Sequence, residues 1–112
     1  MKNKKQEENP ATDFHQAINR KDINRIEALM CDAHVMTDKA GQKLEGKAAC
    51  LDAWRSFFVM FPDYHHEIKY VKRLDKGILI YGFAYSRHPE LHGPARWFAR
   101  IENGKVRSWE IS

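Results

Sequence analysis

GKAACLDAWRSFFVMFP, residues 46–62, is the stretch of sequence that decides the fold. Apolar side chains recur in it every three or four residues and form two adjacent stripes along an expected helix, residues 47–61. A helix that is apolar over so wide an arc must be covered on more than one side. Pro62 ends the helix, because proline cannot continue the hydrogen-bond ladder and disfavours helix just before itself.

Two shorter helices are expected on the N-terminal side of this stretch. Thr12 can cap a helix whose apolar face includes Phe14 and Ile18, and Asp22 can cap a second short helix. A strand at residues 34–38 follows, and a polar turn then leads to the long helix.

Beyond Pro62 the pattern changes to strands. The expected strands are residues 64–73, 78–86, 95–102 and 105–111. Asn103 and Gly104 predict a tight hairpin between the last two, since both residue types tolerate positive φ. The element order therefore predicts an α+β domain with an antiparallel meander.

The length and the amino-acid composition of the chain limit the class of protein. A chain of 112 residues with 43% hydrophobic residues makes one packed domain, expected at residues 12–112. No apolar run approaches the roughly 20 residues of a spanning helix, so no membrane partner is expected. Residues 1–11 are polar, lack the apolar stretch of a secretion signal, and are predicted to be a disordered tail of a cytoplasmic protein. Cys31 and Cys50 have no metal or redox spacing and are expected to be buried or half-buried thiols.

Partners can be inferred from charge and from strand alternation. The net charge of +4 is concentrated after residue 66, but a solvated sheet face explains it better than nucleic-acid binding. The strand at residues 78–86 has no polar side, so both of its faces should be covered. Three helices can cover only one face, and we expect a second copy of the chain to cover the other. That face carries Leu79, Tyr81, Phe83 and Tyr85.

The order of elements and several short motifs together resemble the nuclear transport factor 2-like superfamily, in particular its SnoaL-like and ketosteroid-isomerase-like branches. The motifs are FHQAIN at residues 14–19, IEAL at 26–29, EGK at 45–47, FPD at 61–63 and NGKV at 103–106. The resemblance covers nearly the whole chain from Phe14. It implies a cone-shaped curved antiparallel sheet around the long helix, a pocket open at one end, and a homodimer formed through the sheet. Members include both enzymes and binding proteins, so the fold alone gives no reaction.

Asp38 is the first candidate catalytic residue. The resemblance places it at the end of the first strand, where isomerase-like members keep a carboxylate base facing the pocket. A carboxylate in an apolar cavity has a raised pKa and can move a proton next to a carbonyl. The alternative is a turn residue whose side chain caps the backbone ahead of Gly41.

His66 is the second candidate. Counting alternation from Ile68 places it on the inward face, where a histidine could act as acid or base with Asp38. The alternative is a histidine packed against a helix and bonded to the backbone.

The isomerases also need two acids to hold a developing oxyanion. By the resemblance, their tyrosine corresponds to Phe14 and their aspartic acid to Trp97, so ketosteroid isomerase chemistry as such is not expected. The expected pocket wall is apolar and comprises Phe14, Ile18, Met36, Trp54, Phe58, Trp97 and Trp109. These aromatic residues could instead fill the core. No metal-binding motif is present, and neither a metal nor a cofactor is expected.

Three functions remain open on the sequence. The first is a homodimer that binds a small apolar molecule with one polar end, which Asp38 and His66 would contact. The second is a proton-transfer isomerase, cyclase or dehydratase that uses Asp38 as base. The third is a protein-interaction module without a ligand.

Overall fold

The computed structural model of the protein describes residues 9–112, so the first eight residues of the predicted tail lie outside the described residues. Helix α2, Pro10–Arg20, begins two residues before the predicted cap. Its cap is Asn9, whose side chain accepts a hydrogen bond from the Thr12 N–H at 2.9 Å. The Thr12 hydroxyl accepts one from the Asn9 N–H at 3.2 Å, so Thr12 is the second partner of a capping box rather than the cap itself.

The other two helices follow their predicted limits closely. Helix α3, Ile23–Leu29, is capped by Asp22 as predicted, and Met30 is already the first residue of the next strand. Helix α4, Lys47–Met60, ends one residue before the predicted limit. No helix among residues 9–112 is long and apolar enough to cross a membrane.

The strands form one curved sheet. They are β1 Met30–Thr37, β2 Lys43–Glu45, β3 His65–Leu74, β4 Gly77–Tyr85, β5 Gly93–Glu102 and β6 Lys105–Ile111, with a short 3-10 helix, η1, at Pro89–Leu91. Their order across the sheet is β2-β1-β6-β5-β4-β3. Register shifts interrupt the β1–β6, β3–β4 and β5–β6 ladders, and such irregularities bend a sheet.

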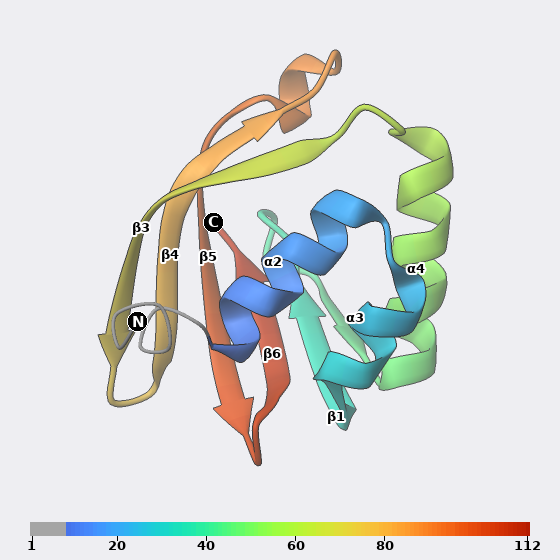
Figure 1. The fold of residues 1–112 in the computed structure, drawn as a ribbon. Helices are drawn as coiled ribbons and strands as arrows, with labels where there is room; N and C mark the ends of the chain where they lie inside the picture. Colours follow the sequence, from blue (N-terminus) through green and yellow to red (C-terminus); the bar gives the residue numbers. More distant parts are fainter. Residues whose placement is uncertain (1–8) are drawn as a thin grey trace.

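The predicted meander of four antiparallel strands is confirmed, and Asn103-Gly104 makes the tight hairpin with both residues at positive φ. Two features of the sheet edge were not predicted. The short strand β2 was missed, and β1 joins the sheet parallel to β6. The expected α+β fold, with helices against one face of a curved sheet, is nevertheless the one observed (Figure 1).

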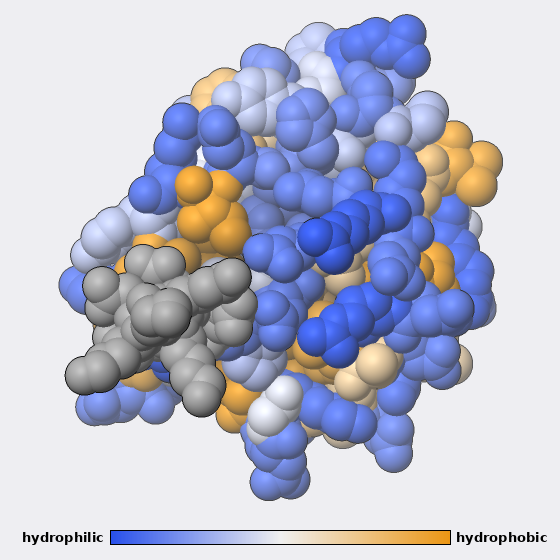
Figure 2. All heavy atoms as spheres, in the orientation of Figure 1, coloured by the Kyte–Doolittle hydropathy of each residue, from blue (hydrophilic) through white to orange (hydrophobic). Residues whose placement is uncertain are grey.

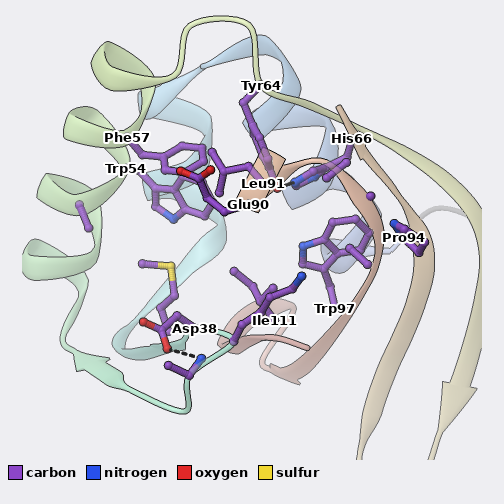
Figure 3. A pocket seen from close by; sticks show the side chains of 17 residues that line it. Asp38, Trp54, Phe57, Tyr64, His66, Glu90, Leu91, Pro94, Trp97 and Ile111 are labelled. Carbon is purple, nitrogen blue, oxygen red and sulfur yellow. Dashed lines mark hydrogen bonds between the residues drawn. The ribbon is translucent and has the colours of Figure 1, made fainter. Parts of the chain in front are cut away.

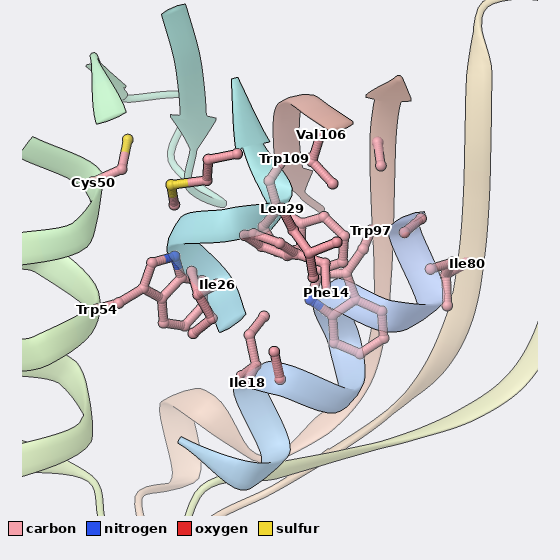
Figure 4. Packing of buried hydrophobic residues seen from close by; sticks show 14 of the residues in the cluster. Phe14, Ile18, Ile26, Leu29, Cys50, Trp54, Ile80, Trp97, Val106 and Trp109 are labelled. Atoms are coloured by element: carbon pink, nitrogen blue, oxygen red, sulfur yellow. The ribbon is translucent and has the colours of Figure 1, made fainter. Parts of the chain in front are cut away.

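The core lies between the helices and the concave face of the sheet (Figure 4). Phe14 and Ile18 of α2 and Ile26 of α3 pack there with Trp97 and Trp109 of the sheet. The outer surface of the helical side is largely polar (Figure 2). Cys50 is buried and Cys31 half-buried, both as free thiols, as predicted.

Strand β4 shows the predicted alternation. Ile78, Ile80 and Ala84 are buried against the helices, whereas Leu79, Phe83 and Tyr85 are half-exposed on the convex face. Tyr81 on the same face is 37% exposed. The chain therefore covers one face of β4 and leaves apolar side chains on the other.

Candidate ligand-binding site

A cavity of about 440 Å³ opens between α4 and the sheet (Figure 3). This volume falls within the range of small-molecule sites, roughly 300–1,000 Å³. The cavity is lined by Met36, Asp38, Lys39, Ala40, Ala53, Trp54, Phe57, Tyr64, His66, Ala84, Glu90, Leu91, Gly93, Pro94, Ala95, Trp97 and Ile111. We call the buried part around Tyr64, His66 and Trp97 the inner end, and the exposed part around Asp38 and Glu90 the mouth.

Aromatic rings from α4 make one wall. Trp54 and Phe57 line the cavity, with ring centroids 5.7 Å apart at a steep angle, and Phe57 meets Tyr64 edge-on at 4.8 Å. Phe58 stacks on Trp54 at 5.6 Å but does not itself line the cavity. This wall forms because the apolar arc of α4 is wider than the core needs, which leaves part of it facing open space.

Trp97 of β5 makes the opposite wall and is 1% exposed. It lies against Gly82 of the neighbouring strand, where a Cβ atom would meet the Trp97 ring and the Glu67 carbonyl. The glycine is therefore required mainly by the close approach of the Glu67 carbonyl on β3, and it also leaves space beside the Trp97 ring. The indole N–H of Trp97 is buried and has no hydrogen-bond partner among residues 9–112.

The inner end holds three polar side chains in a row. Nε2 of His66 lies 2.6 Å from the Tyr64 hydroxyl oxygen. Nδ1 of His66 lies 3.1 Å from Nδ1 of His15, which belongs to helix α2. Their exposed fractions are 8% for Tyr64, 4% for His66 and 1% for His15. Tyr64 and His66 line the cavity, and His15 stands behind them.

Helix α2 positions His66 through two residues one turn apart. His15 contacts the imidazole ring, and Asn19, at i+4, lies on the same face of the helix. The Asn19 side chain accepts a hydrogen bond from the His66 N–H at 2.7 Å and donates one to the His66 carbonyl at 2.9 Å. Both the backbone and the ring of His66 are therefore fixed by one helix.

Burial keeps these groups neutral. It lowers the pKa of His15 to about 3. Burial also lowers the pKa of His66 well below its usual value, and the neighbouring His15 and His65 lower it further by charge repulsion. The pKa of the Tyr64 hydroxyl is raised by burial. At neutral pH the inner end thus offers hydrogen bonds without a net charge.

Asp38 lies at the mouth and is exposed. Its Oδ1 atom accepts hydrogen bonds from the backbone N–H groups of Ala40 and Gln42, both at 2.9 Å. This is the turn-capping arrangement that the sequence left open as the alternative, and it is not a carboxylate enclosed in an apolar cavity. Asp38 and His66 both line the cavity, one at its mouth and the other at its inner end.

The predicted wall residues divide into two groups. Met36, Trp54 and Trp97 line the cavity. Phe14, Ile18 and Trp109 do not, because each is fully buried in the core behind it (Figure 4). Phe14 packs on Trp109 at 4.7 Å and on Trp54 at 6.3 Å, so it supports the wall without forming it.

Sequence reasoning missed Tyr64, Phe57 and His15. The alternation that placed His66 inward also places Tyr64 inward, two residues earlier, so a signal was present. His15 is preceded by Ala11 and followed by Ile18, at spacings of four and three, which is a second buried stripe on α2. Among residues 9–112 no three side chains of the metal-binding types are grouped to hold an ion.

Comparison with known proteins agrees with this architecture. The SnoaL-like domain family matches residues 11–109, nearly the whole chain. The chain belongs to the SnoaL-like domain family. No curated protein matches it.

Solved structures resemble this SnoaL-like domain over almost its full length. A putative polyketide cyclase from Sinorhizobium meliloti is 17% identical, with 92% of this chain and 93% of that one covered, at a TM-score of 0.84. An uncharacterised cystatin-fold protein from Novosphingobium aromaticivorans is 21% identical, with 92% and 94% covered, at 0.79. A putative ketosteroid isomerase from Kribbella flavida is 12% identical, with 91% and 73% covered, at 0.78. At these identities the likeness shows the nuclear transport factor 2-like fold alone.

Proposed function

We propose that this SnoaL-like domain binds one small, largely apolar molecule per chain in the 440 Å³ cavity, with the polar end of that molecule at the inner end. The observation that carries the proposal is the buried indole N–H of Trp97, which has no partner among the described residues and belongs to the cavity-lining ring at the inner end; the indole N–H of Trp54, on the α4 wall, also has no partner there. Leaving a buried donor unpaired costs about 1–3 kcal/mol. A ligand that accepts a hydrogen bond removes that cost.

The inner end replaces Asp38 as the place where the polar end of the ligand is recognised. By the family resemblance, Trp97 stands where isomerase-like members carry an aspartic acid. Trp97 has no acidic proton, but it keeps a hydrogen-bond donor at that place. The resulting site can bind and polarise an acceptor group without ionising it.

The test is binding of N-phenylnaphthylamine, an apolar dye whose fluorescence rises in apolar surroundings. We expect one site per chain. Ala53 lines the cavity, so Ala53→Trp should fill it and abolish dye binding. Ala48 lies on the same helix and is exposed, so Ala48→Trp is the matched control and should bind as the wild type does. Equal binding by both variants would place the dye elsewhere, and no binding by the wild type would favour an interaction module.

The dimer is part of the same proposal. Leu79, Phe83 and Tyr85 leave an apolar convex face that a second copy of the chain would cover. Phe83 and Tyr85 also contact each other at 4.9 Å, which makes a continuous aromatic surface. The wild type should sediment as a dimer at micromolar concentration, and the double change Tyr81→Glu and Phe83→Glu should give monomers, since an unpaired buried charge is costly. The exposed substitution Gln16→Glu on α2 should leave the dimer intact; a monomeric wild type removes this part of the proposal.

The second candidate is proton transfer with Asp38 as base. Its support is that Asp38 lines the mouth and that both of its turn hydrogen bonds use Oδ1 rather than Oδ2. Such a base would take a proton from the carbon next to a ligand carbonyl and return a solvent proton. In heavy water, acetylnaphthalene would then gain deuterium at its methyl group faster with the wild type than with Asp38→Asn. Equal rates would eliminate Asp38 as a base for this probe.

A further inference from the structure

The side chains of Tyr64, His66 and His15 are joined by two hydrogen bonds, and this row ends at a nitrogen with no partner among residues 9–112. Nε2 of His15 is buried and makes no hydrogen bond to any residue among 9–112. Both histidines are neutral, so each carries one ring proton. The contact between the two Nδ1 atoms requires that one donates and the other accepts.

Only two proton arrangements satisfy both hydrogen bonds. In the first, the Tyr64 hydroxyl donates to Nε2 of His66, Nδ1–H of His66 donates to His15, and His15 keeps its proton on Nε2. In the second, Nδ1–H of His15 donates to His66, and Nε2–H of His66 donates to the Tyr64 oxygen. The hydroxyl hydrogen of Tyr64 then takes part in neither hydrogen bond, and it belongs to a residue that lines the cavity.

The environment of His15 decides between the two. The first arrangement leaves an unpaired N–H in the core, which folded proteins rarely tolerate, whereas the second leaves only an unpaired lone pair. Besides His66, whose ring centroid is 4.2 Å away, the rings next to His15 are Trp97, edge-on at 4.4 Å, and Trp109 at 5.7 Å. An N–H directed at an indole face is a weak, second-order interaction. The second arrangement is therefore favoured.

We propose that His15 is a positioning residue: by donating its Nδ1–H to His66 it holds Nε2–H of His66 on Tyr64, so that Tyr64 presents a donor to the cavity. This rests on the proposed function and names its ligand class. With Trp97, the inner end then offers two neutral donors from cavity-lining residues. The ligand that fits is a neutral molecule with an acceptor, such as a carbonyl oxygen, at its inner end.

The proton arrangement can be measured directly in the protein without ligand. In ¹⁵N-labelled protein, long-range proton–nitrogen spectra distinguish a protonated from an unprotonated ring nitrogen. We expect His15 to be protonated at Nδ1 and His66 at Nε2. A proton on Nε2 of His15 overturns the proposal, because Tyr64 would then donate to His66 and offer only lone pairs to the cavity.

Ligand choice provides the second test, with two probes of nearly equal shape. Acetylnaphthalene has a carbonyl where isopropenylnaphthalene has a methylene group. One hydrogen bond of typical net strength predicts that the wild type binds the carbonyl probe about fivefold to tenfold more tightly. Tyr64→Phe should remove a preference of that size, because the carbonyl loses the Tyr64 donor and keeps only the Trp97 N–H.

Variants of His15 then separate positioning from packing. His15→Leu fills the space but cannot hold the His66 ring, so the part of the preference due to Tyr64 should fall to less than about twofold. His15→Asn retains an amide donor near the position of Nδ1 and should restore it. Full preference in His15→Leu would mean that His15 only packs, which overturns the proposal. If neither probe binds the wild type, the proposed function fails for this ligand class, and the nitrogen spectra still decide the proton arrangement.

Discussion

The two ends of the cavity are built by different physical means. At the inner end, Tyr64, His66 and Trp97 are nearly inaccessible and are fixed by a helix, a strand ladder and ring contacts. At the mouth, Asp38 is exposed and is fixed by hydrogen bonds to backbone N–H groups of the turn at residues 38–42. The difference teaches that a carboxylate at the edge of a pocket need not be its polar site, since neutral groups that are deeply buried interact more strongly with a ligand.

Acidification should give the largest effect and should act through the buried histidines, which are His15 and His66 at the inner end and His34 in the core. Folding lowers the pKa of His15 to about 3 from a usual value of 6.5, and lowers that of His66 in the same direction. The unfolded chain therefore binds more protons below pH 6.5, and stability is lost as the pH falls. Each histidine contributes a slope of about 1.4 kcal/mol per pH unit. Denaturant unfolding from pH 7 to pH 5 measures it, and His15→Leu should reduce the slope by one histidine; an unchanged slope would contradict a neutral buried His15.

Replacing Trp97 should give the next largest effect. Trp97→Ala removes a ring that contacts both His15 and His66, and large-to-small core changes of this kind cost about 3–5 kcal/mol. Leu91→Ala, at a half-exposed position that also lines the cavity, should cost less than about 1.5 kcal/mol. Chemical denaturation compares the two. If both variants lost the same amount of unfolding free energy, Trp97 would be no more tightly packed than Leu91, which contradicts the contrast between the two ends.

Asn19→Ala should destabilise the position of His66 at the inner end, although Asn19 itself does not line the cavity. The substitution removes two hydrogen bonds to the His66 backbone, with an expected loss of about 2 kcal/mol in unfolding free energy. It should also broaden the His66 ring signals in NMR spectra, because one of the two anchors of that residue is gone. Exposed Asn24 on α3 offers the control, and Asn24→Ala should change neither quantity.

Asp38 should show the smallest effects. Asp38→Ala removes two hydrogen bonds within a turn and should cost about 1 kcal/mol, while Asp38→Asn retains an acceptor and should cost less than about 0.5 kcal/mol. Thermal unfolding in parallel measures both. A loss from Asp38→Asn as large as that from Asn19→Ala would contradict the contrast between the two ends.

Much of the fold could be predicted because it depends on local patterns. The width of the apolar arc on α4, the stop at Pro62, the cap at Asp22 and the hairpin at Asn103-Gly104 are each set by a few neighbouring residues. The parallel pairing of β1 with β6 was not predicted, since strand partners far apart in the chain leave no mark on alternation.

The site was predicted only in part for a related reason. His66 was correctly placed inward, because successive side chains of a strand point to opposite faces and this alternation can be counted from neighbouring residues. Its partners come from elsewhere in the chain: His15 and Asn19 lie 51 and 47 positions away. Asp38 shows the opposite case. Its position at the end of a strand suggested a catalytic group in the pocket, but its side chain accepts a hydrogen bond from the backbone of the following turn.

Helix α2 connects the start of the described chain to the inner end of the cavity. Its cap, Asn9, is the first residue that the structure describes, and ten positions later Asn19 holds the backbone of His66. These two points are joined by one continuous helix of 11 residues. If the chain is trimmed up to Asn9, the first turn of the helix loses its cap, and the contact between Asn19 and the His66 backbone should weaken as well. On the proposed function, this truncation should also weaken ligand binding, although Asn9 is not among the residues that line the cavity.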